Sequence, residues 1–253
     1  MSCSVLKSLL RKNAVLYWAF TAVIVGYFFM VILMYPMVRD IMAEIPIFGD
    51  DFADIGGYTA MVISELAWMF GLILFIMFVF KLAYKPVDSG SLSTHLMAGV
   101  SRTKYLVTVT IFLLIKLAVL FVLIVGVGVL SFVILGESFV FIDFFATTLL
   151  SMLALGAVTF IAFALAVIFA NKKMALGLLI GIPVLLYVLL MVSNIHHSIE
   201  FIRWVTVFGW FVPGEVANGA FSLWWLVAIG YVALIALCAI VSAIIFKRKN
   251  LSL

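Results

Sequence analysis

Charge and cysteine are both scarce in this sequence. Only 10% of its 253 residues are charged, whereas 68% are hydrophobic; a soluble domain is about a quarter charged. No polar segment is longer than about thirty residues, which leaves no room for a soluble domain of catalytic size. Cys3 and Cys238 lie far apart and provide neither a disulfide framework nor the clustered ligands of a zinc site. The composition predicts an integral membrane protein with a single transmembrane domain, residues 1–253.

Motifs for nucleotide and metal chemistry are also missing. No G-x-x-x-x-G-K-[ST] phosphate loop occurs, so the chain is not expected to bind ATP in that manner. His196, His197 and Glu200 lack the further ligands of a metal site, and surface positions are the favoured interpretation. An intramembrane enzyme would need a matched catalytic set, which Glu65 and Lys116 alone do not supply. We therefore expect no enzyme activity, no metal and no cofactor in this chain.

Long apolar runs are what the sequence has in abundance. A helix of about twenty apolar residues crosses a hydrocarbon core of about 30 Å, and a spanning segment must satisfy its own backbone hydrogen bonds. The sequence therefore predicts an all-α, polytopic protein with six transmembrane helices. The runs cover approximately residues 14–38, 59–83, 104–135, 143–170, 175–193 and 223–246.

The positions of lysine and arginine predict the orientation. If the N-terminus is inside, twelve of the 15 basic residues fall on the cytoplasmic side, Arg39 and Arg203 fall outside, and Lys116 lies within a span. Because cytoplasmic loops are enriched in these residues, both termini are expected to be cytoplasmic. The net charge of +4 then reflects topology beside an anionic leaflet and requires no nucleic-acid partner.

Residues 1–13 form a short amphipathic segment before the first span. Val5, Leu6, Leu9 and Leu10 recur at helical spacing among Lys7, Arg11 and Lys12. Such a segment is typical of a helix that lies along the inner membrane interface. A positively charged leader that only sets the topology is the alternative.

The most polar stretch of the chain lies in residues 84–103, on the predicted cytosolic side. Pro86 should end the second helix, and Ser101 can cap the third span. Between them the spacing predicts a helix of two to three turns. Its apolar face consists of Leu92, Leu96, Met97 and Val100. Lipid, the chain's own helices or a partner protein could cover that face.

This loop resembles the cytosolic coupling loop of the ABC-type-2 permease family, the membrane subunits of ATP-driven exporters. In that family an acidic residue and Gly-Ser/Thr precede a leucine-rich turn, and Ser-Arg follows before the third span. The matching residues here are Asp88, Gly90-Ser91-Leu92, Leu96-Met97 and Gly99-Val100-Ser101-Arg102. Family members often have glutamate and proline where this chain has Asp88 and Gly99. The resemblance covers nearly the whole chain, and the size and layout are similar to bacterial exporters of amphipathic peptide toxins such as the phenol-soluble modulins.

The resemblance implies a function and partners. The coupling helix, with Asp88, Gly90, Leu92, Leu96, Met97, Val100 and Arg102, would dock on a separate ABC ATPase that holds ATP and Mg. A second permease copy or a related chain would complete the pathway in a bacterial plasma membrane. The expected function is export of a hydrophobic or amphipathic substrate, peptide or lipid-like. A self-contained channel or secondary transporter without an ATPase partner is the alternative.

Two ionisable residues are predicted to lie within the membrane. Glu65 is about two turns inside the second span, and Lys116 is about three turns along the third. Intramembrane charges are costly and usually face the protein interior. The two spans run antiparallel, so the residues could pair. The pair would be either a salt bridge between helices or a polar lining where two halves of a pathway meet.

Residues 194–222 form a long outer segment before the last span. Trp204, Phe208 and Phe211 make it too apolar for a plain loop, and Pro213-Gly214 interrupt it before it reaches spanning length. Backbone at membrane depth is tolerated only when it is buried in protein or lines a cavity. The segment is therefore predicted to be re-entrant, either closing the outer side of a pathway or capping the spans.

Overall fold

Within the residues described here, the chain folds entirely into helices. The computed structural model describes residues 3–43, 54–88, 101–169, 172–194 and 197–248, and no strand occurs among them. Six helices are long and apolar enough to cross a membrane, which confirms the all-α class and the six predicted spans. They are Ala14–Leu33, Ile55–Tyr84, Thr103–Leu135, Phe141–Ile168, Lys173–Ser193 and Trp224–Lys247. The protein is therefore a multi-pass membrane protein.

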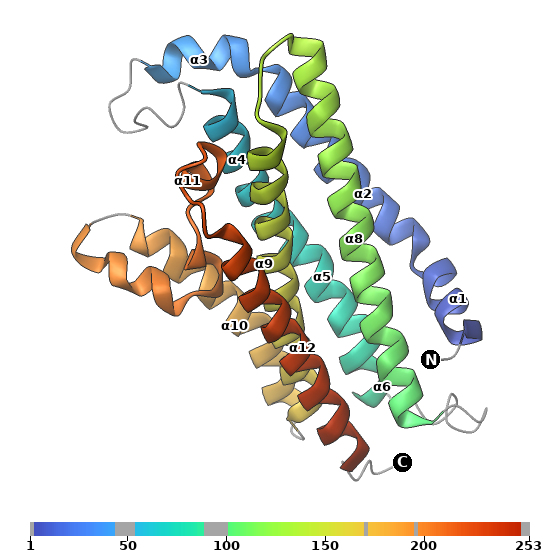
Figure 1. Ribbon diagram of the computed structural model, residues 1–253. Helices are drawn as coiled ribbons and strands as arrows, with labels where there is room; N and C mark the ends of the chain where they lie inside the picture. Colours follow the sequence, from blue (N-terminus) through green and yellow to red (C-terminus); the bar gives the residue numbers. More distant parts are fainter. Residues whose placement is uncertain (1–2, 44–53, 89–100, 170–171, 195–196, 249–253) are drawn as a thin grey trace.

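Shorter elements connect these spans. The helices are α1 (Cys3–Lys12), α2 (Ala14–Leu33), α3 (Tyr35–Ala43), α4 (Ile55–Leu66), α5 (Leu72–Val79), α6 (Lys85–Asp88), α8 (Arg102–Leu135), α9 (Phe141–Ile168), α10 (Lys172–Ser193), α11 (Pro213–Ala217) and α12 (Trp224–Arg248). Two 3₁₀ segments, η4 (His197–Val205) and η5 (Val207–Trp210), lie between α10 and α11. In Figure 1 the two chain ends lie toward the same end of the helical assembly.

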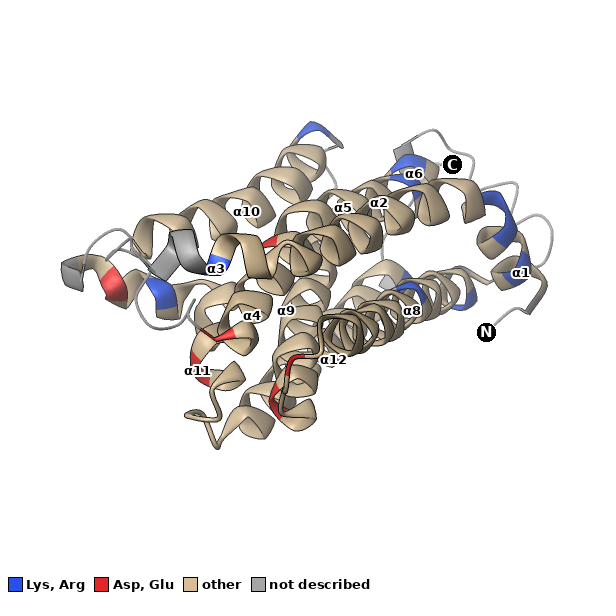
Figure 2. Ribbon diagram, turned by 90° about the horizontal axis from the view of Figure 1, so that it is seen from above, with Lys and Arg blue, Asp and Glu red and all other residues tan. Residues whose placement is uncertain are grey.

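The fourth span is the centre of the fold. In an 18-residue apolar stretch taken from each span, 78% of α9 is buried inside the protein, but only 22% of α10 and of α12. Seen from above, α2, α5 and α10 lie on one side of α9, and α8 and α12 lie on the other (Figure 2). Small residues allow this close packing: Gly156 faces the side chains of Leu117 and Ile235 from neighbouring spans. The second span is also mostly buried, at 61%, whereas the first, third, fifth and sixth spans are 22% to 33% buried and present most of their surface to whatever surrounds the protein.

The second span is not a regular α-helix. It begins at Asp54, whose carboxylate accepts a hydrogen bond of 3.0 Å from the backbone N–H of Gly56. Two π-helical turns, η2 (Ala67–Gly71) and η3 (Phe80–Tyr84), interrupt it before and after α5. Such turns insert extra residues into a helix and are frequent at functional sites. Hydrophobic periodicity alone did not predict them.

The third span is longer than a bilayer requires. Ser101 caps α8 by accepting a hydrogen bond from the backbone N–H of Lys104, as predicted. The helix then continues for 34 residues, which is about 51 Å at 1.5 Å per residue. It ends at Gly136, whose φ of 69° is favourable only for glycine. Part of α8 therefore extends beyond a hydrocarbon core of ordinary thickness.

Candidate functional site

The predicted coupling loop lies mostly outside the described residues. Asp88 is the last residue of α6 and Arg102 is the first of α8. The intervening positions Gly90, Leu92, Leu96, Met97 and Val100 fall outside the described ranges. The docking role of this loop remains a prediction from sequence.

Lys116 is buried against aromatic rings, and none of the described carboxylates forms an ion pair with it. Its side chain is 6% exposed. The ammonium nitrogen lies 3.8 Å from the centre of the Tyr17 ring, with Trp18 and Phe112 at 5.7 Å and 5.9 Å. The Tyr17 hydroxyl also donates a hydrogen bond of 2.8 Å to the Lys116 carbonyl. A cation over an aromatic face is attracted by the ring quadrupole, so α2 supplies the lysine's main stabilising contact.

Glu65 has a different environment. It is exposed on the second span, and its carboxylate accepts a hydrogen bond of 2.7 Å from the Tyr187 hydroxyl on α10. Together with Tyr27, Val31 and Met69 it also lines a shallow cavity of about 190 Å³ between α2 and the second span. The carboxylate thus lies at the junction of three spans.

The predicted pairing of Glu65 with Lys116 is wrong. Lys116 contacts Tyr17, whereas Glu65 shares its cavity with Tyr27. These two tyrosines are ten residues apart on α2, which corresponds to about 15 Å along a helix axis. Lys116 is level with the first turn of α2.

Glu65 belongs to an exposed stripe along the second span. The residues of this stripe recur every four positions and all are exposed: Met61, Glu65, Met69, Ile73 and Met77. We call this set the methionine stripe. Methionine is flexible and polarisable, which suits surfaces that adapt to several partners. The stripe combines such side chains with a single carboxylate.

The outer segment is folded around Arg203. The guanidinium donates hydrogen bonds to the carbonyl oxygens of Gly209, at 3.2 Å, and Phe211, at 2.9 Å. A Cβ atom at position 209 would overlap the Arg203 carbonyl, so glycine is needed for this close approach. Burial lowers the pKa of the Arg203 guanidinium from its usual value. Arg203 is therefore half-buried within the segment.

Aromatic residues attach this segment to the spans. Phe208 is fully buried and Phe211 is 3% exposed. Both rings pack against Trp68, with centroid distances of 5.2 Å and 6.1 Å. Tyr231 of α12 donates a hydrogen bond of 2.7 Å to the Val207 carbonyl. In Figure 1 the segment lies beside the upper part of α9, below the upper ends of α4 and α8.

The remaining predicted residues of the outer segment have other roles. Trp204 is 70% exposed and does not contribute to the buried cluster. Pro213 and Gly214 are the first residues of α11, so they interrupt the apolar segment by beginning a short helix. Proline is favourable at this position because its missing N–H has no helical partner there.

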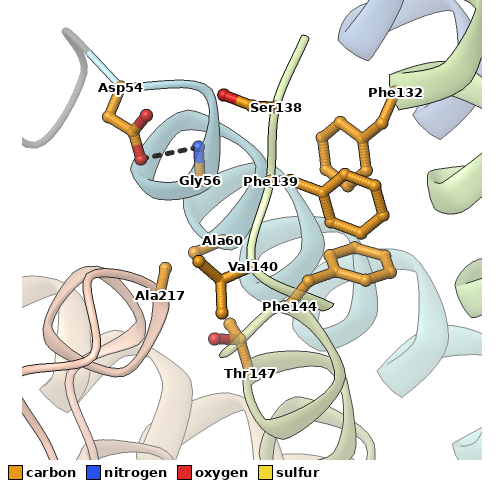
Figure 3. Close-up of a pocket in the computed structure, with 10 residues that line it drawn as sticks. All are labelled: Asp54, Gly56, Ala60, Phe132, Ser138, Phe139, Val140, Phe144, Thr147 and Ala217. Atoms are coloured by element: carbon orange, nitrogen blue, oxygen red, sulfur yellow. Dashed lines mark hydrogen bonds between the residues drawn. The ribbon is translucent and has the colours of Figure 1, made fainter. Parts of the chain in front are cut away.

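A second cavity, of about 320 Å³, lies where α4, α9 and α11 meet (Figure 3). The rings of Phe132, Phe139 and Phe144 line one side of it. Its polar groups already serve the local helices: Asp54 caps α4, and the Thr147 hydroxyl donates to the Asp143 carbonyl at 2.8 Å. This cavity is thus a helix junction to which we assign no chemistry.

Three tyrosines that sequence reasoning missed hold these sites together. Tyr17, Tyr187 and Tyr231 each place a hydroxyl on a group of another span or segment. A tyrosine within an apolar run needs a hydrogen-bond partner, and that requirement was the available signal.

Comparison with known proteins leaves the family unassigned: no protein-family model matches the chain, and no curated protein matches it.

Proposed function

We propose that this chain is the transmembrane permease subunit of an ATP-driven exporter. It would move a hydrophobic or amphipathic substrate, peptide or lipid-like, by coupling to a separate ATPase that binds ATP and Mg. Two permease chains would form the pathway between them. The proposal rests on the resemblance of residues 84–103 to a coupling loop and on one feature of the fold.

That feature is the exposed carboxylate of Glu65. Its position in the second span is ten residues from the start of α4, about 15 Å along the axis. A carboxylate that faces hydrocarbon costs about 3 kcal/mol on insertion scales. One hydrogen bond from Tyr187 offsets only part of this cost. A water-containing pathway or a second protein chain beside the methionine stripe would remove the remaining cost of this carboxylate.

The same stripe supports an amphipathic cargo. Methionines at positions 61, 69 and 77 offer apolar contacts that adjust to different shapes. The carboxylate adds a polar contact in the middle of them. A pathway for a small ion or a sugar would need many more polar groups along the spans, which also argues against a self-contained channel.

The test uses the predicted coupling helix. Leu96→Asp and Met97→Asp place a charge on its expected apolar face, whereas Thr94→Asp places the same charge on its expected polar face. We expect all three variants to insert and fold. The first two should recover at least tenfold less ATPase when the permease is purified with its partner ATPase, because a buried unpaired charge costs several kcal/mol.

Two results would contradict the proposal. One is undiminished ATPase recovery with both apolar-face variants. The other is the lack of any phosphate-loop ATPase that binds the wild-type permease and whose ATP hydrolysis responds to it.

A further inference from the structure

A third cavity lies at the end of the assembly where the two chain termini are found. It has a volume of about 310 Å³, is open on one side, and is lined by α1, the start of α2, the end of the second span and the start of α8. The amphipathic helix α1 forms one wall. Leu9 of α1 is buried against the neighbouring helices, and Val5 is partly buried. The cavity is therefore built by packed elements and is not a gap between mobile loops.

The lining of this cavity is basic and rich in hydroxyls. Ser4, Ser8 and Lys12 recur every four residues and form one edge of α1. Lys81 lies across the cavity on η3. No carboxylate is among the described residues that line it. Two ammonium groups without a carboxylate form an environment that favours an anion.

Asn13, which is one of the lining residues, holds a buried polar atom without a partner among the described residues. Asn13 is 1% exposed, and its amide nitrogen donates a hydrogen bond of 2.9 Å to the Leu9 carbonyl. That bond fixes which end of the amide is oxygen. The oxygen, Oδ1, accepts no hydrogen bond from any described residue. A buried acceptor without a donor is destabilising, so a ligand that carries a hydroxyl or amine would complete the site.

We propose that this cavity binds the headgroup of an anionic phospholipid that bears a hydroxyl, of the phosphatidylglycerol type. The phosphate lies between Lys12 and Lys81, and a glycerol hydroxyl donates to Asn13 Oδ1. The Ser8 hydroxyl of α1 can donate to a remaining phosphate oxygen. Nothing in this proposal depends on the exporter function.

A lipid fits better than a soluble phosphate compound for two reasons. Apolar side chains line the cavity beside the lysines, namely Val5, Leu9 and Leu82, and these suit the glycerol and upper acyl region of a lipid. The cavity also adjoins the first turn of a membrane span and an amphipathic helix, the depth at which headgroups lie.

The experiment measures binding to the purified protein in a neutral detergent. Dioctanoyl phosphatidylglycerol is titrated while thermal unfolding is followed, and phosphatidylcholine, phosphatidic acid and inorganic phosphate are titrated in parallel. The double variant with Lys12→Gln and Lys81→Gln is compared with a control double variant that carries Lys7→Gln and Arg11→Gln. The control pair removes the same charge from exposed positions of α1 that do not line the cavity.

We expect phosphatidylglycerol to bind tighter than the other three. The Lys12/Lys81 pair should weaken it roughly thirtyfold, since each basic residue contributes about 1 kcal/mol to such binding, and the control pair should change it less than about threefold. Asn13→Ala should reduce the preference of phosphatidylglycerol over phosphatidic acid.

Three outcomes would overturn the proposal. Equal stabilisation by phosphatidylglycerol and phosphatidylcholine would mean that the cavity does not select an anion. Equal weakening by the two double variants would mean that general surface charge is responsible. Inorganic phosphate that binds as tightly, with the same dependence on Lys12 and Lys81, would identify a soluble ligand. If Asn13→Ala fails to fold, equal wild-type affinities for phosphatidylglycerol and phosphatidic acid would still rule out the hydroxyl contact.

Discussion

Tyrosine takes the place of an opposite charge beside both ionisable residues discussed above. Lys116 lies over the face of the Tyr17 ring, and Glu65 accepts a hydrogen bond from the Tyr187 hydroxyl. A neutral partner avoids the cost of removing a second ion from water, which often exceeds the attraction between two buried charges. The two sites are therefore energetically separate.

Substitutions at Tyr17 can separate its two contacts with Lys116. Tyr17→Phe removes the hydroxyl but keeps the ring, so a loss of about 1 kcal/mol in unfolding free energy is expected. Tyr17→Leu also removes the aromatic face, and the loss should reach about 3 kcal/mol. Chemical unfolding in detergent measures both. Tyr27→Leu is the control, because Tyr27 is 51% exposed on the same helix; an equal loss there would show that the cation contact contributes nothing.

A pair of double-mutant cycles tests whether the two charged sites are separate. Glu65→Gln and Tyr187→Phe act on one hydrogen bond, so their effects on the unfolding free energy should differ from additivity by about 1 kcal/mol. Glu65→Gln and Lys116→Met act on groups in different contacts and should add within about 0.5 kcal/mol. Coupling between Glu65 and Lys116 instead would contradict the separation of the two sites.

At the scale of the element, the outer segment is a folded unit. Its backbone carbonyls accept hydrogen bonds from Arg203 and Tyr231, and its aromatic rings bury themselves against Trp68. Backbone groups satisfied in this way do not need water. The segment therefore meets the physical condition for the predicted re-entrant depth in the bilayer.

Thiol labelling from outside the cell measures that depth. In a chain without Cys3 and Cys238, single cysteines at Phe208 and Phe211 should react at least tenfold more slowly with an impermeant reagent than a cysteine at Ala220, which is exposed. Arg203→Met should accelerate the reaction at Phe208, because two carbonyls lose their donor. In the exporter, trapping ATP on the ATPase should change both slow rates. Fast labelling at both buried positions, independent of nucleotide, would rule out the re-entrant segment.

At the scale of the whole molecule, the asymmetry around α9 predicts where a second chain binds. The methionine stripe lies on the second span, and α12 lies on the other side of α9 (Figure 2). In membranes that contain the exporter, Met69→Cys should form a disulfide-linked pair of permease chains on mild oxidation. Ile229→Cys on α12 is the control, because Ile229 also lies in an apolar span and is 59% exposed. Crosslinking at position 229 but not at 69 would place the contact on the wrong side for this proposal.

Composition and hydrophobic run length were sufficient to predict the all-α class and the six spans, and the capping preference of serine predicted the cap at Ser101. These features depend on local physics: an apolar run in lipid must be helical because no water can satisfy its backbone. These predictions concern properties that each span has by itself, independent of how the spans pack.

The partners of Glu65, Lys116 and Arg203 depended on how the spans pack. Depth along one span can be counted in residues, but the relative height of two spans depends on loops, π-helical turns and interfacial segments such as α1. The turns η2 and η3 alter the register of the second span, and α1 places the first turn of α2 beside Lys116. Only the tertiary structure therefore decided the contacts between spans. A difference of about 15 Å in height along α2 is enough to replace a Glu65–Lys116 ion pair by two independent contacts with tyrosines.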